Sequence, residues 1–373
     1  MKKILYIINV DWFFISHFLP VAIEAKNRGY NVHIACGITD KQECLESLGL
    51  IVHPLNISRS GKSLVKELTT IMRMFKVIKH VNPNIIEFLT IKPVLYGGIV
   101  SKLFPTRKKV FYITGLGSVF IKKGLKGTIE KNIVKFLYRL ALSGQNSTVI
   151  TENIFDKDLI NSLNTVEKHK IIIIRGAGVN LNQYNYIEEK NDKVVVVMAS
   201  RLLKDKGVFE YVNTAKILKN KGLDVEFELY GDIDEGNPTT LTKNDLDKIK
   251  QDGFVKVHGF SSEISKIFSN AHIIVLPSYR EGLPKVLIEA AACGRAVVTT
   301  DVPGCRDAIE PDVTGLLCNV KDDQSLAEQI EKLILNKDLR NTMGKAGREL
   351  AEKEFDIKKV VQKHFEIYEG AVR

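Results

Sequence analysis

The sequence predicts an α/β fold with two domains, each built around a doubly wound parallel β-sheet. Short apolar runs recur from end to end, helical patterns separate them, and 373 residues are enough for two cores. Strands that are apolar on both faces and alternate with helices are typical of parallel sheets covered on both sides. The runs that predict strands are 3–8, 31–36, 50–55, 84–89, 109–113, 147–150 and 170–174 in the first half, and 193–199, 225–231, 255–259, 272–278 and 296–300 in the second.

The segments between these runs predict helices, because their apolar residues recur every three or four positions. The alternation pauses in a polar stretch at residues 182–193. We therefore expect an N-terminal domain over residues 1–188 and a C-terminal domain over 189–355, with a last helix within 356–373 that packs back on the first domain. One helical series consists of Leu64, Leu68, Ile71, Met72, Phe75 and Ile78.

Composition places the protein in a reducing compartment. The five cysteines are scattered and form no CxxC pair, which argues against a disulfide framework or a zinc site. The apolar N-terminal run is interrupted by Asn9 and Asp11, and no signal-peptide cleavage site follows. No uncharged apolar stretch approaches the ~18 residues of a membrane-spanning helix. We expect a cytoplasmic protein.

The formal charge of +10 is unevenly distributed. Residues 59–139 hold 17 Lys/Arg against three acids, an excess of +14, so the rest of the chain carries −4. A local anionic surface is therefore a better partner than polyanions in general. A nucleic-acid-binding protein is the weaker alternative, because aromatic residues are not interleaved with the cations and no binding motif appears.

Part of this basic region forms an amphipathic pattern. At 100° per residue, Ile129, Ile133, Phe136 and Leu140 share one face, with further apolar residues beside them. The pattern predicts a segment that lies on an anionic membrane leaflet. A core-facing helix with a solvated basic face explains the helix alone equally well. The cations of this predicted membrane or acceptor surface are Lys122, Lys123, Lys126, Lys131, Lys135 and Arg139.

The stretch 272–294 carries the most informative motif. A strand at Ile273–Leu276 ends in a polar loop, and Pro284 marks the first turn of a helix. Gly282 lets the backbone approach a ligand, and amides at a helix start suit an anion or a sugar oxygen. Glu281 follows the strand, and Glu289 lies in an apolar run. A buried carboxylate needs hydrogen-bond donors, so Glu289 alone is also explained by a salt bridge or a backbone partner.

A second motif follows the strand at 193–199. Arg201 and Lys206 flank a turn that opens into a helix near Gly207. Two cations at the carboxyl end of a strand, beside a helix start, suit a diphosphate. A solvated basic loop is the alternative for this segment in isolation.

Together the two motifs resemble those of family-4 retaining glycosyltransferases. The resemblance rests on Glu281-x7-Glu289 in SYREGLPKVLIEAAACGRAVVTTDVPG and on Arg201…Lys206-Gly207, and it extends through the second half of the chain. It implies the GT-B fold, in which two Rossmann-like domains face each other across a cleft. It is greatest to the branch that extends undecaprenyl-diphosphate-linked sugars and includes N-acetylgalactosaminyltransferases.

The resemblance implies roles for the motif residues. Arg201 and Lys206 would hold the donor diphosphate and neutralise the leaving nucleotide. Glu289 would accept hydrogen bonds from the ribose hydroxyls, and Glu281 would hold the donor sugar. The loop that holds the donor sugar would also include three residues next to Glu281. They are Gly282, Leu283 and Pro284.

Two further segments complete the implied donor site. The segment from His258 to Phe260 would lie by the base. Gly231 matches the family's glycine after its strand, although Asp232 stands where many members have a second glycine.

The N-terminal half departs further from the family pattern. Many members have a histidine after the fifth strand, where this chain has Thr114 and Gly115. His17, in an SHFLP context at the start of the first helix, is the remaining candidate for a catalytic histidine. A core histidine is the alternative interpretation.

We therefore expect an enzyme that transfers a HexNAc-type sugar from a UDP-sugar to a polyprenyl-diphosphate-linked saccharide. It would act in surface-glycan or glycoprotein biosynthesis, peripherally on the inner face of the cell membrane, without a metal or another cofactor. The departing phosphate would take the acceptor's proton. The alternative is a nucleotide-sugar 2-epimerase on the same scaffold, for which His17, Asp11 and Glu87 are the available acid/base candidates.

Overall fold

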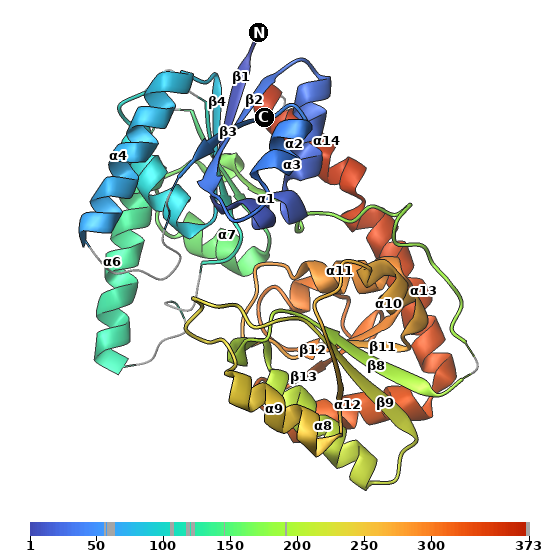
Figure 1. Ribbon diagram of the computed structural model, residues 1–373. Helices are drawn as coiled ribbons and strands as arrows, with labels where there is room; N and C mark the ends of the chain where they lie inside the picture. The colour runs from blue at the N-terminus through green and yellow to red at the C-terminus, as the bar shows by residue number, and fades with distance from the viewer. Residues whose placement is uncertain are drawn as a thin grey trace. The chain divides into compact units, whose positions relative to one another are not determined.

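The computed structural model describes residues 1–55, 57, 64–104, 108–116, 120, 124–144, 146–190 and 192–370. The chain divides into two compact units (Figure 1). The first consists of Met1–Ala177 with Lys359–Arg373, and the second of Gly178–Lys358. Each unit has its own parallel sheet with helices on both faces, so the predicted fold class of two Rossmann-like domains is confirmed.

The first unit is built on a seven-stranded sheet in the order β3-β2-β1-β4-β5-β6-β7. All its strands except the edge strand β3 are largely buried, because one apolar core forms under α1, α2 and α14 and another under α4 and α6. The strands are β1 (Lys3–Val10), β2 (Asn31–Gly37), β3 (Ile51–Pro54), β4 (Ile85–Leu89), β5 (Lys108–Ile113), β6 (Ser147–Thr151) and β7 (Ile171–Ile173). The helices are α1 (Asp11–His17), α2 (Leu19–Asn27), α3 (Gln42–Ser47), α4 (Leu64–Val81), α5 (Gly98–Ser101), α6 (Gly124–Leu142), α7 (Ile154–Asn161) and α14 (Ile357–Glu369).

The second unit has a six-stranded sheet in the order β10-β9-β8-β11-β12-β13. The chain runs outward from β8 to β9 and β10, and then returns to β11 on the other side of β8. The strands are β8 (Val194–Ala199), β9 (Val225–Tyr230), β10 (Lys256–Gly259), β11 (Ile273–Leu276), β12 (Ala296–Thr300) and β13 (Gly315–Cys318). The helices are α8 (Val208–Asn220), α9 (Lys243–Asp252), α10 (Ile264–Asn270), α11 (Lys285–Ala292), α12 (Asp323–Leu335) and α13 (Lys337–Leu350).

The structure differs from the sequence prediction at the boundary between the two units. The first unit ends at Ala177 rather than at residue 188, because Val179 and Tyr184 pack in the core of the second unit. The last helix, α14, packs on the first unit as expected, where Val360 and Phe365 join the core. Strand β13 lies outside the predicted strands.

Two further features concern the helices and the cysteines. Across the parts of the chain that the structure describes, no helix combines the length and the apolar character needed to cross a bilayer. All five cysteines are free, and only Cys44 is exposed.

Candidate functional site

The two predicted motifs meet at the centre of the second unit's sheet. Arg201 and Lys206 follow β8, and Glu281 follows β11, its neighbour. In a parallel sheet the carboxyl ends of all strands lie at one edge, and ligands bind where the strand order reverses. The reversal in this unit lies between β8 and β11. The topology therefore places both motifs at the edge where an open α/β sheet binds ligands.

Two glycines bring the loops at this edge into backbone contact. Gly231 follows β9 with a φ of 142°, and a Cβ there would overlap the carbonyl oxygen of Ser200 at the end of β8. Gly207 has a φ of 76°, and its Cβ would overlap the carbonyl oxygen of Pro277 in the loop after β11. Only glycine tolerates both the backbone conformation and the approach. A glycine is therefore required after β9 for a structural reason, whatever the ligand.

Each predicted diphosphate ligand has a carboxylate partner. Lys206 donates a hydrogen bond to Glu281, which links the turn after β8 to the loop after β11. Arg201 Nη1 lies 2.6 Å from Asp234 Oδ2, an acid that the sequence analysis did not single out. An ammonium carries three donors and a guanidinium five, so one carboxylate does not exhaust either group. The pairs hold the two cations in place while leaving them able to bind an anion.

Glu289 is buried in α11 and has two partners. The Tyr184 hydroxyl donates to its Oε1 at 2.8 Å, and Lys285 Nζ lies 3.4 Å from the same oxygen. Burial raises the pKa of Glu289, while the charge of Lys285 and the hydrogen bond from Tyr184 act in the opposite direction. The surroundings of Glu289 therefore match the alternative interpretation, in which a buried carboxylate is satisfied by its own partners in the fold. Its contact with the ribose stays a prediction.

These partners differ in how visible they are in the sequence. Lys285 precedes Glu289 by four residues in one helix, a spacing that itself indicates an ion pair. Tyr184 lies 105 residues away, in the polar stretch at residues 182–193. No local signal connects it to Glu289.

The loop between β11 and α11 is closely packed. Gly282, Leu283 and Pro284 are all buried, and a Cβ on Gly304 would overlap the carbonyl of Gly282. Pro284 is the N-cap residue, so α11 begins one residue later than predicted. The loop after β12 thus supports the loop that carries Glu281.

An aromatic stack forms where β9 and β10 end. The rings of Tyr230 and His258 are parallel within 7°, with centroids 4.4 Å apart. Glu228 anchors the stack, since it accepts a 2.8 Å hydrogen bond from the Tyr230 hydroxyl and lies 3.6 Å from His258 Nε2. Phe260, just after β10, is largely exposed. Flat aromatic surfaces of this kind suit a nucleobase.

His17 occupies a different position from the predicted one. It is the last residue of α1, not the first, and its ring stacks on Phe13 with centroids 3.9 Å apart. The ring is half-buried. A catalytic role for His17 stays a prediction.

The other two acid/base candidates of the epimerase alternative are engaged in the fold. Asp11 is fully buried and accepts hydrogen bonds from the backbone and hydroxyl of Thr39 and from the backbone of Lys41. Glu87 is fully buried in β4 and accepts a hydrogen bond from Tyr368. Both carboxyls hold secondary-structure elements together.

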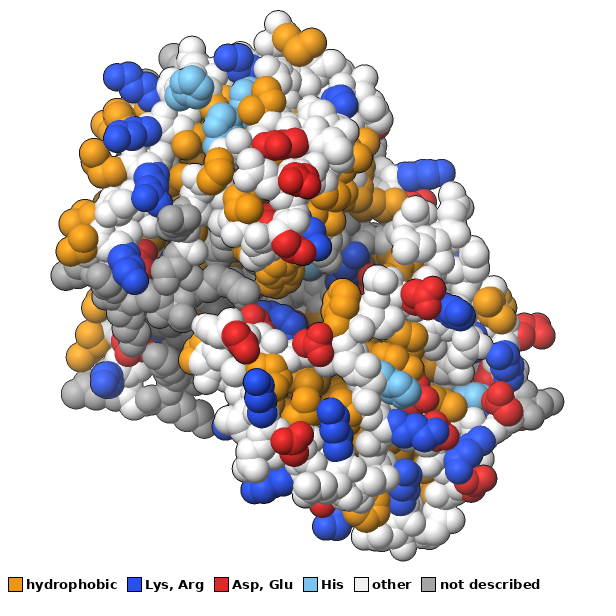
Figure 2. Space-filling model, in the orientation of Figure 1, with side chains coloured by type: hydrophobic (Ala, Val, Ile, Leu, Met, Phe, Trp, Pro, Cys, Tyr) orange, Lys and Arg blue, Asp and Glu red, His pale blue; other side chains and the backbone are white. Residues whose placement is uncertain are grey.

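The basic segment of the first unit is only partly described. Lys122 and Lys123 lie outside the described residues, whereas the other four cations are on α6. Lys126 and Arg139 are exposed, and Lys131 and Lys135 are half-buried. Figure 2 shows Lys and Arg side chains among hydrophobic ones along the edge of the unit that α4 and α6 form.

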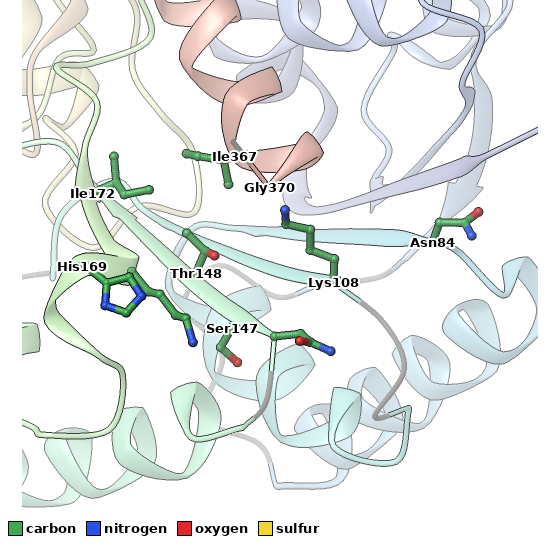
Figure 3. Close-up of a pocket in the computed structure, with 10 residues that line it drawn as sticks. Asn84, Lys108, Ser147, Thr148, His169, Ile172, Ile367 and Gly370 are labelled. Atoms are coloured by element: carbon green, nitrogen blue, oxygen red, sulfur yellow. The ribbon is translucent and has the colours of Figure 1, made fainter. Parts of the chain in front are cut away.

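The first unit also has a cavity of about 390 Å³. It lies at the amino ends of β5, β6 and β7, beside the end of α14 (Figure 3). Lys108 borders it and donates to the carbonyl of Tyr368 at 3.1 Å. None of the predicted site residues lines this cavity. Among the described residues, no cluster of three or more His, Cys, Asp or Glu is arranged to hold a metal ion.

Both halves of the chain match known protein families. The family described as "Glycosyl transferase 4-like" matches residues 3–153, and the one described as "Glycosyl transferases group 1" matches residues 183–350. The second match contains both motifs at the β8–β11 edge.

Two relatives are similar over most of their length. The N,N'-diacetylbacillosaminyl-diphospho-undecaprenol alpha-1,3-N-acetylgalactosaminyltransferase of Campylobacter jejuni is 29% identical, over 96% of each chain. The UDP-Gal:alpha-D-GlcNAc-diphosphoundecaprenol alpha-1,3-galactosyltransferase of Escherichia coli is 23% identical, over 82% of this chain and 80% of its own. Neither relative is an epimerase.

The fold as a whole is shared with solved structures. The Anabaena protein HepE, in complex with UDP and glucose, superimposes with a TM-score of 0.78 at 18% identity, over 99% of this chain and 100% of its own. This likeness concerns the fold, which is that of the GT-B glycosyltransferases.

Proposed function

Because the chain belongs to the glycosyltransferases that combine a 4-like half with a group 1 half, we propose that it transfers a sugar from a UDP-sugar to a saccharide linked to polyprenyl diphosphate. The observation that carries the donor half of this proposal is the presence of two cations, Arg201 and Lys206, at the β8–β11 edge, each held by a carboxylate. The names of the Campylobacter and Escherichia relatives support the acceptor half.

The donor would lie along the carboxyl edge of the second unit's sheet. Its diphosphate would bind Arg201 and Lys206, whose charge stabilises the negative charge that develops as the nucleotide departs. Its base would reach the Tyr230–His258 stack, and its sugar would meet Glu281. The ribose hydroxyls would donate to Glu289.

The reaction we propose retains the configuration of the sugar and uses no metal ion. Two positioned cations supply the charge that the leaving diphosphate requires. The acceptor hydroxyl would attack from the side of the departing phosphate, whose oxygen takes its proton. A HexNAc donor is the finer proposal, supported by the name of the Campylobacter enzyme.

The acceptor would be reached at the cytoplasmic face of the membrane. The excess of +14 over residues 59–139 supports this part, because a lipid diphosphate and an anionic leaflet both attract a basic surface. The donor cations Arg201 and Lys206 lie outside that region, so the excess charge is left for the acceptor side.

The test compares two lysines of one turn. Lys206→Ala should lower transfer by about 100-fold or more, the cost of losing one positioned charge at the leaving group. Lys204→Ala removes the same charge two residues earlier from an exposed position, and should leave turnover unchanged. Transfer is measured with a panel of UDP- and GDP-sugars and a polyprenyl-diphosphate-linked sugar.

Three outcomes would contradict the proposal. Near-normal turnover of Lys206→Ala, or of Glu289→Ala, would refute the donor assignment. A GDP-sugar as the preferred donor would refute the nucleotide. An epimer formed from a UDP-sugar alone, without acceptor, would favour the isomerase alternative.

A further inference from the structure

Three helices of the first unit present large apolar side chains to the outside. They are α4, α5 and α6, and their exposed apolar residues form what we term the three-helix face. Each of these side chains is more than half exposed. The face consists of Val65, Leu68 and Met72 on α4, Leu103 just after α5, and Ile129, Ile133 and Phe136 on α6.

These residues are not the core contact of their helices. The sequence allows α6 to turn its apolar stripe toward the core, but the structure buries Tyr138 and Leu142 instead and leaves Ile133 and Phe136 outside. In α4 the buried positions include Met74 and Ile78, while Leu68 and Met72 stay exposed. Each helix thus has an apolar row in addition to the residues that hold it on the sheet.

Helix α5 connects the exposed residues of α4 with those of α6. It contacts both helices. The rings of Phe75 on α4 and Phe104 after α5 pack with centroids 5.6 Å apart. The face is therefore one surface and not three separate exposures. Contiguous apolar surface of this kind marks an interaction site.

The charges around the face identify the partner. Helices α4 and α6 contain one acid each, and Glu67 is paired with Lys92 at 2.6 Å. A second copy of this chain would set like charges against each other, which disfavours a dimer. A surface that is apolar inside and anionic at its boundary, as a bilayer of acidic lipids is, matches both features. The exposed cations of this region are Lys66, Arg73, Lys76, Lys79, Lys102, Lys126 and Arg139.

We propose that the three-helix face docks on an anionic bilayer, with its apolar side chains inserted below the lipid headgroups and its cations at the phosphates. This inference rests on the proposed function, since it names the surface by which the enzyme reaches a lipid-linked acceptor. It adds α4 and α5 to the basic segment and assigns insertion to particular side chains. Adsorption by charge alone would need none of them.

The first experiment measures insertion directly. The chain has a single tryptophan, Trp12. In a Trp12→Phe background, Phe136→Trp should shift its fluorescence to the blue on vesicles of phosphatidylglycerol and phosphatidylcholine, and brominated lipids should quench it. Leu335→Trp in the same background is the control, since Leu335 is also more than half exposed but lies on the second unit. An unshifted Phe136→Trp signal on vesicles that bind the protein would overturn insertion.

The second experiment keeps the native tryptophan and measures binding. Ile133→Ser with Phe136→Ser should lower partitioning onto the same vesicles on the order of tenfold or more, because two large apolar side chains no longer leave water. Leu335→Ser should leave it unchanged. Equal partitioning of both variants would overturn the proposal. So would a loss of self-association in the double variant without a change in vesicle binding, which would identify a contact between copies.

The vesicles in both experiments contain no acceptor. If the protein inserts as expected but transfers no sugar to any lipid-linked acceptor, the proposed function fails and the docking surface stands. If it transfers sugar to a water-soluble acceptor analogue but does not bind vesicles, the docking surface fails and the proposed function stands.

Discussion

Replacing Glu87 by Gln should remove a pH dependence of stability from the first unit. Glu87 lies in β4 and is fully buried where α14 crosses the sheet. Tyr368 on α14 donates to one carboxyl oxygen, and His364 Nδ1 lies 3.5 Å from the other. Burial raises the pKa of Glu87 to about 8, although the hydrogen bond from Tyr368 lowers it. Near neutral pH the folded protein therefore holds a proton that the unfolded chain releases.

The sign and size follow from this proton. Because the folded state binds it and the unfolded chain does not, the free energy of unfolding falls as pH rises toward 8. The slope is about 1.4 kcal/mol per pH unit. Between pH 6.5, which is the ordinary pKa of histidine, and pH 8, the ionisation of Glu87 lowers the free energy of unfolding by about 2 kcal/mol.

The neighbouring groups do not mask the effect in this range. Burial lowers the pKa of His364 to about 3, so this histidine is neutral throughout. Burial also raises the pKa values of Tyr6, Tyr112 and Tyr368 well above 10, so these hydroxyls keep their protons. Glu87 is the member of this cluster that titrates between pH 6.5 and 8.

The assay is urea unfolding followed by the fluorescence of Trp12, which lies in the first unit and is the only tryptophan. Between pH 6.5 and pH 8 the wild type should lose about 2 kcal/mol relative to Glu87→Gln, which cannot ionise at this position, because every other group titrates alike in the two proteins. Parallel pH profiles in the two proteins would refute the reasoning, as would a wild type that gains stability relative to Glu87→Gln over this range.

Two further substitutions test packing in the second unit. Gly231→Ala should destabilise it by several kcal/mol, because a Cβ would overlap the Ser200 carbonyl. Gly222→Ala, also at positive φ but with nothing within 4 Å, should cost only about 1–2 kcal/mol, and equal losses in urea unfolding would disprove the steric argument. Glu189→Ala should cost about 3 kcal/mol, because it leaves the buried Arg340 guanidinium without its carboxylate. Glu188→Ala, next to it and exposed, should cost almost nothing, and a loss below about 1 kcal/mol for Glu189→Ala would contradict a structural ion pair.

The local pattern of apolar residues was enough to predict the sheets, because an uninterrupted apolar run of five or six residues indicates a strand that is buried on both faces. The same logic located the β8–β11 edge, since Arg201, Lys206 and Glu281 lie in the segments that follow β8 and β11. It missed β13, and it placed His17 at the wrong end of α1. Helix ends depend on capping contacts that a periodic pattern does not contain.

What the sequence could not predict depends on contacts between distant residues. The partners of Glu289 and Arg201 include Tyr184 and Asp234, which no spacing rule connects to them. The apolar series of α4 and α6 identified helices, but not which of two apolar directions meets the sheet. That choice is made by the space between neighbouring helices, and it determined which residues stay exposed.

The second unit is an insertion into the first. The chain enters it at Gly178 and leaves it at Lys358, and these two crossings run together, with Val179 paired to Asp356. During synthesis the second unit can therefore fold completely while the first still lacks α14 and the residues that close its core. A chain truncated before α14 would therefore contain a complete second unit and a first unit without its last helix, so the truncation would destabilise the unit that was synthesised first.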